Sequence, residues 1–416
     1  MAFTPIDTTS GGGDTGKQGG DKINTMLFEV YGLLQSNAID PATVATARVL
    51  RAAPATTYPV MANPPTVTFG AANGAVTAVL AGSTAIKPTS IESVNGRMGH
   101  FTATGTFPAG IYRGDWISSA NNESVYGIGV EYRQRAATFA IRVRDIGVSL
   151  IFMARRADGP WQYVSNTPST IPGATGTGSN FHWVSLTFPV VDDWTVRFLA
   201  NGPLFQHTDV LQTSTLTPTL PSRNDRPRIF MQGDSYTAAT AQIASPVRSI
   251  PMAMGERLGC DVHVVGVGGQ GLLNAVNSKT FVTQMTDFDL LGAPDLFVCL
   301  GSVNDYSSTA GDLQAATSAY ITALLTRFPN CPIVFVEPFN APLASPARVF
   351  TTAQRTAIRA GFNAAAGSLK RAKYVTVDPN ALTSDKLGPD LLHPNDLGGV
   401  TAGDLIANAI TTALRG

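Results

Sequence analysis

A serine, a histidine and an aspartate in the second half of the chain have the types and spacing that acyl transfer requires. Ser235 lies in the stretch RPRIFMQGDSYTAAT, between an apolar run and small residues compatible with a helix. A serine hydroxyl is a weak nucleophile and needs a base within hydrogen-bond reach to take its proton. His393 can supply that base, and Asp390, three residues earlier in the same loop, can hold Nδ1–H and direct Nε2 toward the serine. The pattern predicts a triad of Ser235, His393 and Asp390.

Acyl transfer also needs hydrogen-bond donors where negative charge develops on the substrate oxygen. The candidates are the backbone N–H of Ser235, the N–H of Gly269 and the side-chain amide of Asn304. A glycine at 269 lets the backbone approach a substrate without an intervening Cβ. Gly268 is the alternative to Gly269, because the two glycines are adjacent in GVGGQG. We therefore expect an oxyanion hole built from three separate segments of the chain.

Each of these residues also has an ordinary structural explanation. Asp and Ser are good helix N-caps, so Gly-Asp-Ser can simply begin a helix. Asn304-Asp305 can begin a turn, and His393-Pro394 can belong to a loop. The combination is harder to explain in this way, because the serine, the glycine and the asparagine each follow a predicted strand.

From residue 221 onward the sequence alternates apolar strands with helical stretches. The predicted strands are RIFMQ, DVHVVGV, DLFVCLG, CPIVFVEP and KYVTVDP, and the predicted helices cover residues 246–259, 311–328, 350–371 and 396–414. Continuous apolar strands that alternate with helices indicate a parallel sheet with helices on both faces. Ligands of such sheets bind at the carboxyl ends of the strands, where the residues described above are expected to lie.

In the region before residue 221, apolar residues recur with a different period. Over residues 66–213 apolar and polar residues alternate; in TFAIRVRD, for example, Phe139, Ile141 and Val143 share one face opposite arginines. Such segments recur between turn signals, which is typical of a β-sandwich of the jelly-roll type. Residues 41–64 are rich in Pro, Ala and Thr and predict a linker or an extended arm.

The N-terminal segment predicts a flexible lead-in followed by one amphipathic helix. Residues 1–20 are rich in Gly, Thr, Asp and Ser, and apolar residues at three- and four-residue steps mark a helix over 21–35. We therefore expect three parts. They are residues 1–45 for attachment or oligomerisation, 46–220 for an all-β sandwich that binds carbohydrate or braces its neighbour, and 221–416 for an α/β catalytic domain.

Composition excludes several classes of protein. The 416 residues carry 29 basic and 29 acidic side chains, so the formal charge is zero and no nucleic-acid partner is expected. The chain start lacks the pattern of a secretory signal, and no apolar run of about eighteen residues occurs, so we expect neither Sec export nor a membrane partner. Cys260, Cys299 and Cys331 lack metal-binding spacing and are expected to be free buried thiols; we expect no metal and no cofactor.

Four short blocks, taken in order, resemble the SGNH (GDSL-type) hydrolase family. They are GDSY at 233–236, GVGGQG at 266–271, GSVND at 301–305 and DLLHPN at 390–395. The resemblance covers roughly residues 226–416 and implies a three-layer αβα fold together with the triad and oxyanion roles described above. No G-x-S-x-G motif occurs, so the nucleophile elbow of the α/β-hydrolases is absent.

Two further resemblances suggest a setting. An all-β sandwich followed by an SGNH domain resembles carbohydrate esterases that remove O-acetyl groups from polysaccharides. The stretch GDTGKQGGDKINTMLFEVYGLL resembles the opening segments of bacteriophage tail and tail-fibre proteins. Together they imply a phage tail-associated deacetylase of an acetylated bacterial surface polysaccharide, located in the virion, with attachment to other tail proteins or a homotrimer. A bacterial carbohydrate esterase of the same chemistry, without a Sec signal, is the runner-up.

Two rival classes stay open. GVGGQG also fits the dinucleotide-binding fingerprint, with Asp287 and Asp289 at about the expected distance, although these precede the next strand rather than end it. The second rival is a tail protein that binds glycan through an inactive hydrolase fold. The four tryptophans could stack on sugars if exposed, but Trp183 and Trp194 alternate with apolar residues and are expected in the core.

Overall fold

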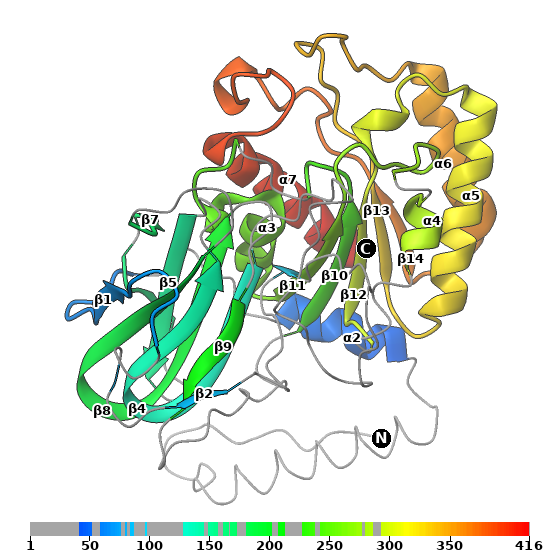
Figure 1. The fold of residues 1–416 in the computed structure, drawn as a ribbon. Helices are drawn as coiled ribbons and strands as arrows, with labels where there is room; N and C mark the ends of the chain where they lie inside the picture. The colour runs from blue at the N-terminus through cyan, green and yellow to red at the C-terminus, as the bar shows by residue number, and fades with distance from the viewer. Residues whose placement is uncertain are drawn as a thin grey trace, which may run out of the picture.

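The computed structural model describes most of the second half of the chain and parts of the first. The described residues are 41–51, 59–75, 80, 84–86, 96–97, 128–144, 149–156, 161–165, 167–172, 180–201, 207–212, 227–237, 242–276, 279–285 and 293–415. The helix predicted over 21–35 lies outside them. Figure 1 shows two regions of secondary structure, a curled antiparallel sheet and a parallel sheet flanked by helices.

A six-stranded parallel sheet organises the C-terminal half of the chain. Its strands are β3 Gly96–Arg97, β10 Arg228–Gly233, β11 Asp261–Gly266, β12 Leu296–Leu300, β13 Ile333–Val336 and β14 Ala372–Val375, in the order β14-β13-β12-β10-β11-β3. Every neighbouring pair is parallel. The five strands predicted beyond residue 221 are confirmed. The sixth, β3, comes from within the range predicted for the β-sandwich.

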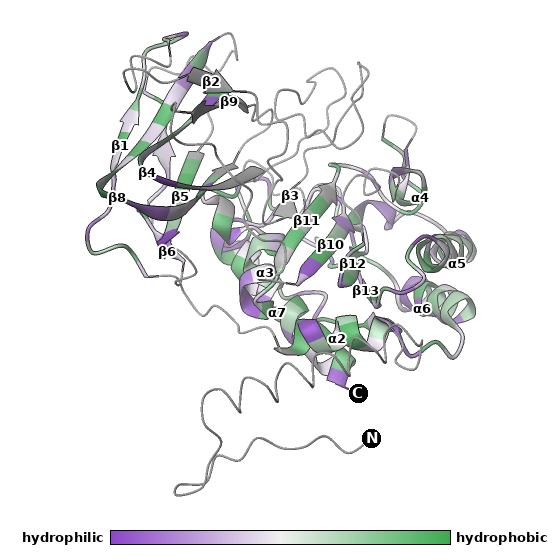
Figure 2. Ribbon diagram, turned by 90° about the horizontal axis from the view of Figure 1, so that it is seen from below, coloured by the Kyte–Doolittle hydropathy of each residue, from purple (hydrophilic) through white to green (hydrophobic). Residues whose placement is uncertain are grey.

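Helices cover both faces of this sheet, so the αβα prediction is confirmed (Figure 2). One face carries α2 Pro41–Arg51, α3 Ile250–Leu258 and α7 Asp396–Arg415, and the other carries α4 Phe281–Gln284, α5 Ala310–Arg327 and α6 Thr352–Ala366. Alternate strand residues serve the two faces: Ile229 and Met231 join the core under α3 and α7, whereas Phe230 joins the core under α5. Because both faces are buried, the strands are apolar throughout.

The prediction of a linker over residues 41–64 is wrong for residues 41–51, which form α2. Ala42 and Val49, seven residues apart, are buried on one face of this helix, and Val49 belongs to the core under α7. Arg48 also forms an ion pair with Asp295, which precedes β12. Composition alone suggested a linker, but the spacing of the buried residues is that of a helix.

The N-terminal half contains an eight-stranded antiparallel sheet dominated by two long strands, β4 Ile128–Arg144 and β8 Phe181–Asn201. The sheet order is β2-β9-β4-β8-β5-β6, with β1 beside β8 and β7 beside β5. The shorter strands are β1 Thr66–Phe69, β2 Thr84–Ile86, β5 Ser149–Arg156, β6 Gln162–Tyr163, β7 Ser169–Thr170 and β9 His207–Gln212.

This sheet curls, so that both halves of β8 share one core. Its register against β4 shifts once, and such a bulge bends a strand. Leu186 from the first half of β8 and Phe198 from its second half lie in the same hydrophobic cluster. Phe188 stacks on Trp194 with ring centroids 4.2 Å apart. The predicted all-β character is confirmed, whereas the jelly-roll topology stays a prediction because the described strands form one sheet.

The antiparallel sheet packs against α3. Met153 of β5 and Trp161 form a buried cluster with Met252 of α3, and Tyr163 packs against that cluster. The Tyr163 hydroxyl lies 3.4 Å from a carboxylate oxygen of Glu256. This contact is largely apolar and buried, so the sheet braces the helical layer of the other region.

The tryptophans of the described residues, Trp161, Trp183 and Trp194, are all buried. Core positions for Trp183 and Trp194 are therefore confirmed. Trp161 is covered by the guanidinium of Arg197, whose Cζ lies 3.9 Å from the ring centroid. None of these three rings is exposed for stacking on a sugar.

The cysteine prediction is also confirmed, because Cys260, Cys299 and Cys331 are free and buried. Burial in apolar surroundings raises the pKa of the Cys299 thiol. Among the helices of the described residues, none combines the length and the apolar character needed to cross a membrane.

Close packing of α5 on α6 depends on a glycine. A Cβ built at Gly361 of α6 would lie 2.2 Å from the backbone oxygen of Gln314 on α5. We expect Gly361→Ala to lower the free energy of unfolding by about 1–3 kcal/mol, because the helices would have to move apart. Gly311→Ala is the control, since its Cβ would meet only Thr309 at 3.9 Å. Equal melting temperatures for the two variants would contradict the prediction.

Candidate active site

Ser235 lies in a tight turn directly after β10. The carboxylate of Asp234 accepts from the N–H of Tyr236 at 2.9 Å, and the Asp234 carbonyl accepts from the Thr237 hydroxyl at 2.8 Å. A Cβ at Gly233 would lie 2.5 Å from Thr237 Cγ2, so only glycine fits before the turn. The sequence Gly-Asp-Ser-Tyr therefore forms a compact turn that presents the serine at the carboxyl edge of the sheet.

The structure brings the three predicted triad side chains together. His393 Nε2 lies 3.0 Å from Ser235 Oγ, and His393 Nδ1 lies 2.6 Å from Asp390 Oδ2. The Tyr236 hydroxyl donates to the carbonyl of Leu392 at 2.8 Å, which ties the serine turn to the histidine loop. A base within hydrogen-bond reach of a serine and oriented by a carboxylate is the arrangement that activates the hydroxyl.

The local fold of the loop holds the Asp390 carboxylate beside the imidazole. Asp390 Oδ1 accepts from the N–H groups of Leu392 and His393 at 3.1 and 3.0 Å. Leu391 has a positive φ of 54°, which turns the chain back at this point. Partial burial raises the pKa of Asp390, but the hydrogen bonds from His393 and Leu392 outweigh this effect and hold the pKa below its usual value. The carboxylate is therefore ionised at neutral pH and stabilises the Nδ1–H tautomer.

Asn304 lies in the loop after β12. This loop is next to the serine turn in space, although β11 and its flanking loops separate the two in the sequence. Its Nδ2 lies 3.2 Å from Asp234 Oδ2, 3.2 Å from the carbonyl of Gln270 and 3.1 Å from Ser302 Oγ. Its Oδ1 accepts from the guanidinium of Arg348. The amide thus joins three loops, and its donation to a substrate oxygen stays a prediction.

The glycine segment lies beside the serine. A Cβ added at Gly268 would have only Ser235 Cβ within 4 Å, at 3.8 Å, and Gly269 has a left-handed φ of 82°. Gly269 therefore favours glycine for its conformation, whereas a Cβ at Gly268 would make only an ordinary contact with the serine. Within the described part of the chain, no acceptor pairs with the N–H of Ser235, Gly268 or Gly269. Among the described residues, these N–H groups are therefore available as donors near the nucleophile.

The strand order explains why these segments meet. The chain leaves β10 for β11 on one side and then returns to β12 on the other side. The carboxyl ends of β10 and β12 therefore flank the point where the direction of winding reverses, which is where open α/β sheets bind ligands. Ser235 follows the first of these strands and Asn304 follows the second.

Two residues of the site were not singled out by sequence reasoning as functional. Asp305 accepts from the N–H groups of Leu272, Leu273 and Asn274 at 2.7, 3.1 and 3.1 Å and so holds the glycine segment. The sequence signal was available, because Asp305 closes the block GSVND. Arg348, which donates to Asn304, lies in a loop without a recognisable motif.

The dinucleotide alternative fails on the glycine segment. In the fingerprint the glycines open a helix whose N-terminus binds the pyrophosphate. Here residues 267–276 form turns, and the next helix, α4, begins only at Phe281. Among the described residues no group of three or more His, Cys, Asp or Glu side chains is arranged to hold a metal ion.

Comparison with known families identifies the domain that carries this site. Residues 232–399 match the model of the GDSL-like Lipase/Acylhydrolase family. The match starts on β10 and ends in α7, so it includes all four blocks noted in the sequence. No curated protein sequence gives a significant match to the chain.

Solved structures with the same fold extend beyond this domain. A family 2 carbohydrate esterase with a carbohydrate binding domain from Myceliophthora fergusii is 18% identical, covers 73% of this chain and 98% of its own, and has a TM-score of 0.51. An acetyl xylan esterase from the rumen bacterium Butyrivibrio proteoclasticus is 13% identical, with coverages of 80% and 98% and a TM-score of 0.53. A salicylyl-acyltransferase from a tetracycline biosynthetic pathway is 12% identical, with coverages of 80% and 97% and a TM-score of 0.57.

At these identities the likeness concerns the fold. Coverage of up to 80% of the chain extends well past the residues that the family model matches, so these structures share more than the parallel-sheet region. Taken with the family match, residues 232–399 form a GDSL-type (SGNH) hydrolase domain, and the chain is a carboxylic ester hydrolase.

Proposed function

We propose that this hydrolase removes O-acetyl groups from a bacterial surface polysaccharide through a Ser235, His393, Asp390 triad. The observation that carries the proposal is the continuous hydrogen-bonded path from Asp390 through His393 to Ser235, with distances of 2.6 and 3.0 Å. The solved structures of similar fold include a carbohydrate esterase and an acetyl xylan esterase, which supports an acetylated glycan as the substrate.

The geometry suits a two-step mechanism. Ser235 Oγ attacks the acetyl carbonyl carbon while His393 Nε2 accepts the hydroxyl proton and Asp390 holds Nδ1–H. The backbone N–H groups of Ser235 and Gly269, with the Asn304 amide, are the proposed donors to the oxyanion. The tetrahedral intermediate then expels the sugar oxygen, which takes the proton from His393 and leaves as a hydroxyl group. Water, deprotonated by the same imidazole, attacks the acetyl-serine, and the imidazole returns the proton to Ser235 Oγ as acetate leaves.

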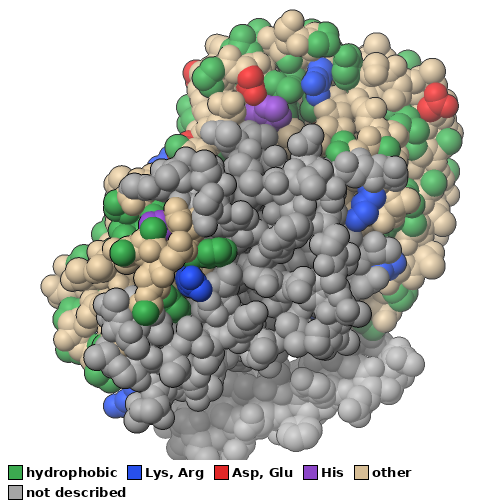
Figure 3. All heavy atoms as spheres, in the orientation of Figure 1, with side chains coloured by type: hydrophobic (Ala, Val, Ile, Leu, Met, Phe, Trp, Pro, Cys, Tyr) green, Lys and Arg blue, Asp and Glu red, His purple; other side chains and the backbone are tan. Residues whose placement is uncertain are grey.

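Exposed apolar side chains surround the proposed site. Hydrophobic side chains gather at the top of the view in Figure 3, over the loops at the carboxyl edge of the sheet. Four large apolar residues of these loops are exposed, Leu273, Leu343, Val349 and Leu391, as is Leu397 in the first turn of α7. An apolar rim of this kind can contact the carbon-bearing faces of sugar rings and the acetyl methyl group.

The setting that we propose is a phage tail that acts at the bacterial surface, with attachment to other tail proteins or a homotrimer. The resemblance of the N-terminal segment to tail proteins supports it. A bacterial carbohydrate esterase of the same chemistry is the alternative. The burial of Trp161, Trp183 and Trp194 favours a bracing role for the antiparallel sheet over sugar binding through these rings.

Replacing the nucleophile tests the mechanism. We expect Ser235→Ala to lower kcat for p-nitrophenyl acetate by at least about a thousandfold, because no other group can form the acyl-enzyme. Circular dichroism and the melting temperature should stay unchanged. Ser368→Ala, at an exposed position after α6 and therefore at the opposite edge of the sheet, is the control. Full activity of Ser235→Ala would exclude this mechanism.

The substrate class is tested by acetate release from a panel of O-acetylated bacterial polysaccharides, with chemically deacetylated samples of each as blanks. The proposal expects acetate from at least one glycan with the wild-type protein and none with Ser235→Ala. Hydrolysis of simple esters without acetate release from any of the glycans would contradict the proposed substrate while leaving the esterase chemistry intact.

The link between the serine turn and the histidine loop is tested by Tyr236→Phe. Loss of the hydroxyl leaves the Leu392 carbonyl without its 2.8 Å partner and frees the loop that positions His393. We expect kcat to fall about fivefold, equivalent to about 1 kcal/mol, with KM nearly unchanged. Tyr163→Phe, at the contact between the sheet and α3, is the matched control. Equal kcat values for the two variants would show that this hydrogen bond does not position the imidazole.

A further inference from the structure

We propose that Arg348 is a positioning residue for the hydrolysis, acting through the side chain of Asn304. The proposal rests on the function proposed above, since it concerns the amide predicted to stabilise the oxyanion. Arg348 Nη1 donates to Asn304 Oδ1. This contact links the loop after β13 to the loop after β12, between residues 44 positions apart in the sequence.

The environment of Arg348 directs its charge toward that amide. The side chain is partly buried, and its Nε is shielded from solvent and has no hydrogen-bond partner. Among the described residues no carboxylate forms an ion pair with Arg348. The guanidinium carbon lies over the ring of Tyr306, 5.9 Å from its centroid. Partial burial of a cation without a carboxylate partner costs free energy. We therefore infer that its position next to Asn304 has a function.

The hydrogen bond determines which way the amide faces. Reversing the Asn304 carboxamide would set its NH2 group against the guanidinium, so Oδ1 must face Arg348 and Nδ2 must face the serine turn. A charge-assisted hydrogen bond to Oδ1 also polarises the amide and strengthens its N–H groups as donors. Both effects favour donation from Nδ2 when negative charge develops on a substrate oxygen.

The positive charge also reaches the nucleophile turn. Burial raises the pKa of Tyr236, and the charge of Arg348 opposes that rise. Tyr236 is the residue after Ser235 and contacts the histidine loop. Arg348 therefore adds positive potential near the serine as well as holding Asn304.

The backbone of Arg348 is held before any substrate binds. The N–H of Ala341 donates to the carbonyl of Arg348 at 2.8 Å, and the N–H of Arg348 donates back to Ala341 at 2.9 Å. These two bonds close a loop over residues 341–348 at the carboxyl end of β13. The backbone that carries the guanidinium group is therefore held in place.

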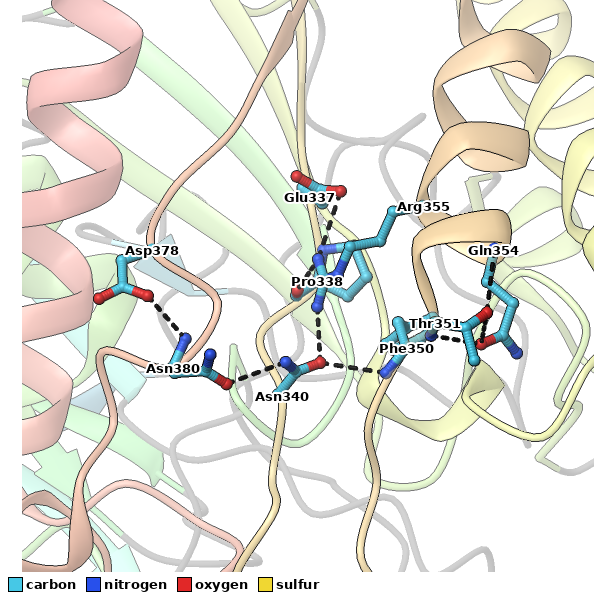
Figure 4. A network of polar contacts seen from close by, with 9 residues as sticks. All are labelled: Glu337, Pro338, Asn340, Phe350, Thr351, Gln354, Arg355, Asp378 and Asn380. Atoms are coloured by element: carbon cyan, nitrogen blue, oxygen red, sulfur yellow. Dashed lines mark hydrogen bonds and ion pairs between the residues drawn. The ribbon is translucent and has the colours of Figure 1, made fainter.

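A polar network secures the start and the end of this loop (Figure 4). Asn340 Oδ1 accepts from the N–H of Phe350 at 3.1 Å and from Arg355 at 2.6 Å. Asn340 Nδ2 donates to Asn380 at 2.9 Å, and Arg355 lies 3.3 Å from Glu337. The network joins the ends of β13 and β14 to α6, so it leaves little freedom for the loop to drift.

An alternative role for an unpaired arginine is to bind an acidic group of the substrate. The two roles differ in their effect on a neutral ester. A substrate anchor would leave hydrolysis of p-nitrophenyl acetate unchanged, because that ester carries no negative charge. A positioning residue would lower kcat for the same ester, with KM nearly constant, because its effect acts on the transition state.

The test is a double-mutant cycle on p-nitrophenyl acetate with Arg348→Met, Asn304→Ala and the combined variant. We expect Arg348→Met alone to lower kcat about tenfold or more. Arg348→Lys should lower kcat by a smaller factor, because it keeps the charge but not the planar donor group. In the Asn304→Ala background, removal of Arg348 should change kcat by less than about twofold.

Arg359→Met on α6 is the charge-matched control, because Arg359 lies over the Tyr374 ring and away from Asn304; its kcat should equal that of the wild type. Melting temperatures separate folding defects from positioning, and Arg348→Lys carries the test if Arg348→Met is unstable. An unchanged kcat, a change confined to KM, or full additivity with Asn304→Ala would each overturn the proposal. Full activity of Ser235→Ala would instead remove the proposed function, a result that no Arg348 variant can produce.

Discussion

The site depends on one buried carboxylate, that of Asp234. It accepts from the N–H of Tyr236 within the serine turn, and from Ser302 Oγ, Val303 N–H and Asn304 Nδ2 in the loop after β12. Burial raises the pKa of Asp234, and the hydrogen bonds from Tyr236, Ser302 and Val303 counteract that rise. A buried carboxylate is tolerated only where donors surround it. The same requirement forces the ends of β10 and β12 into one geometry, so the nucleophile and the asparagine cannot move independently.

Other carboxylates in the domain also accept hydrogen bonds from loop N–H groups. Asp305 accepts three backbone N–H groups of the glycine segment, and Asp396 accepts from Ala244 and Ser245 at 2.7 and 3.1 Å. Asp390 accepts two N–H groups of its own loop before it contacts the imidazole. Loops at the edge of a parallel sheet lack ladder partners for their N–H groups, and short acidic side chains satisfy them locally. The result is a set of loops rigid enough to hold catalytic distances.

The hydrophobic cores fix the strands whose carboxyl ends carry these loops. The residues of β12 are all buried, and alternate residues of the central strands belong to the cores on opposite faces of the sheet. The antiparallel sheet adds a further contact through Met153 and Met252, which joins the curled region to α3. A site built on rigid strands and fixed loops pays little reorganisation when charge develops in the transition state.

Several features followed from the sequence alone. The strands and their parallel arrangement followed from local apolar runs. Ser235 followed from its place after one of those strands, and Asp390 and His393 followed from their spacing within one loop, because these signals are local. The contacts that only the tertiary structure decided join distant segments. They include the orientation of the Asn304 amide, its partner Arg348, the pairing of β3 with β11, and the packing of α2. No periodicity records such contacts, since they depend on where separate loops meet after the sheet has formed.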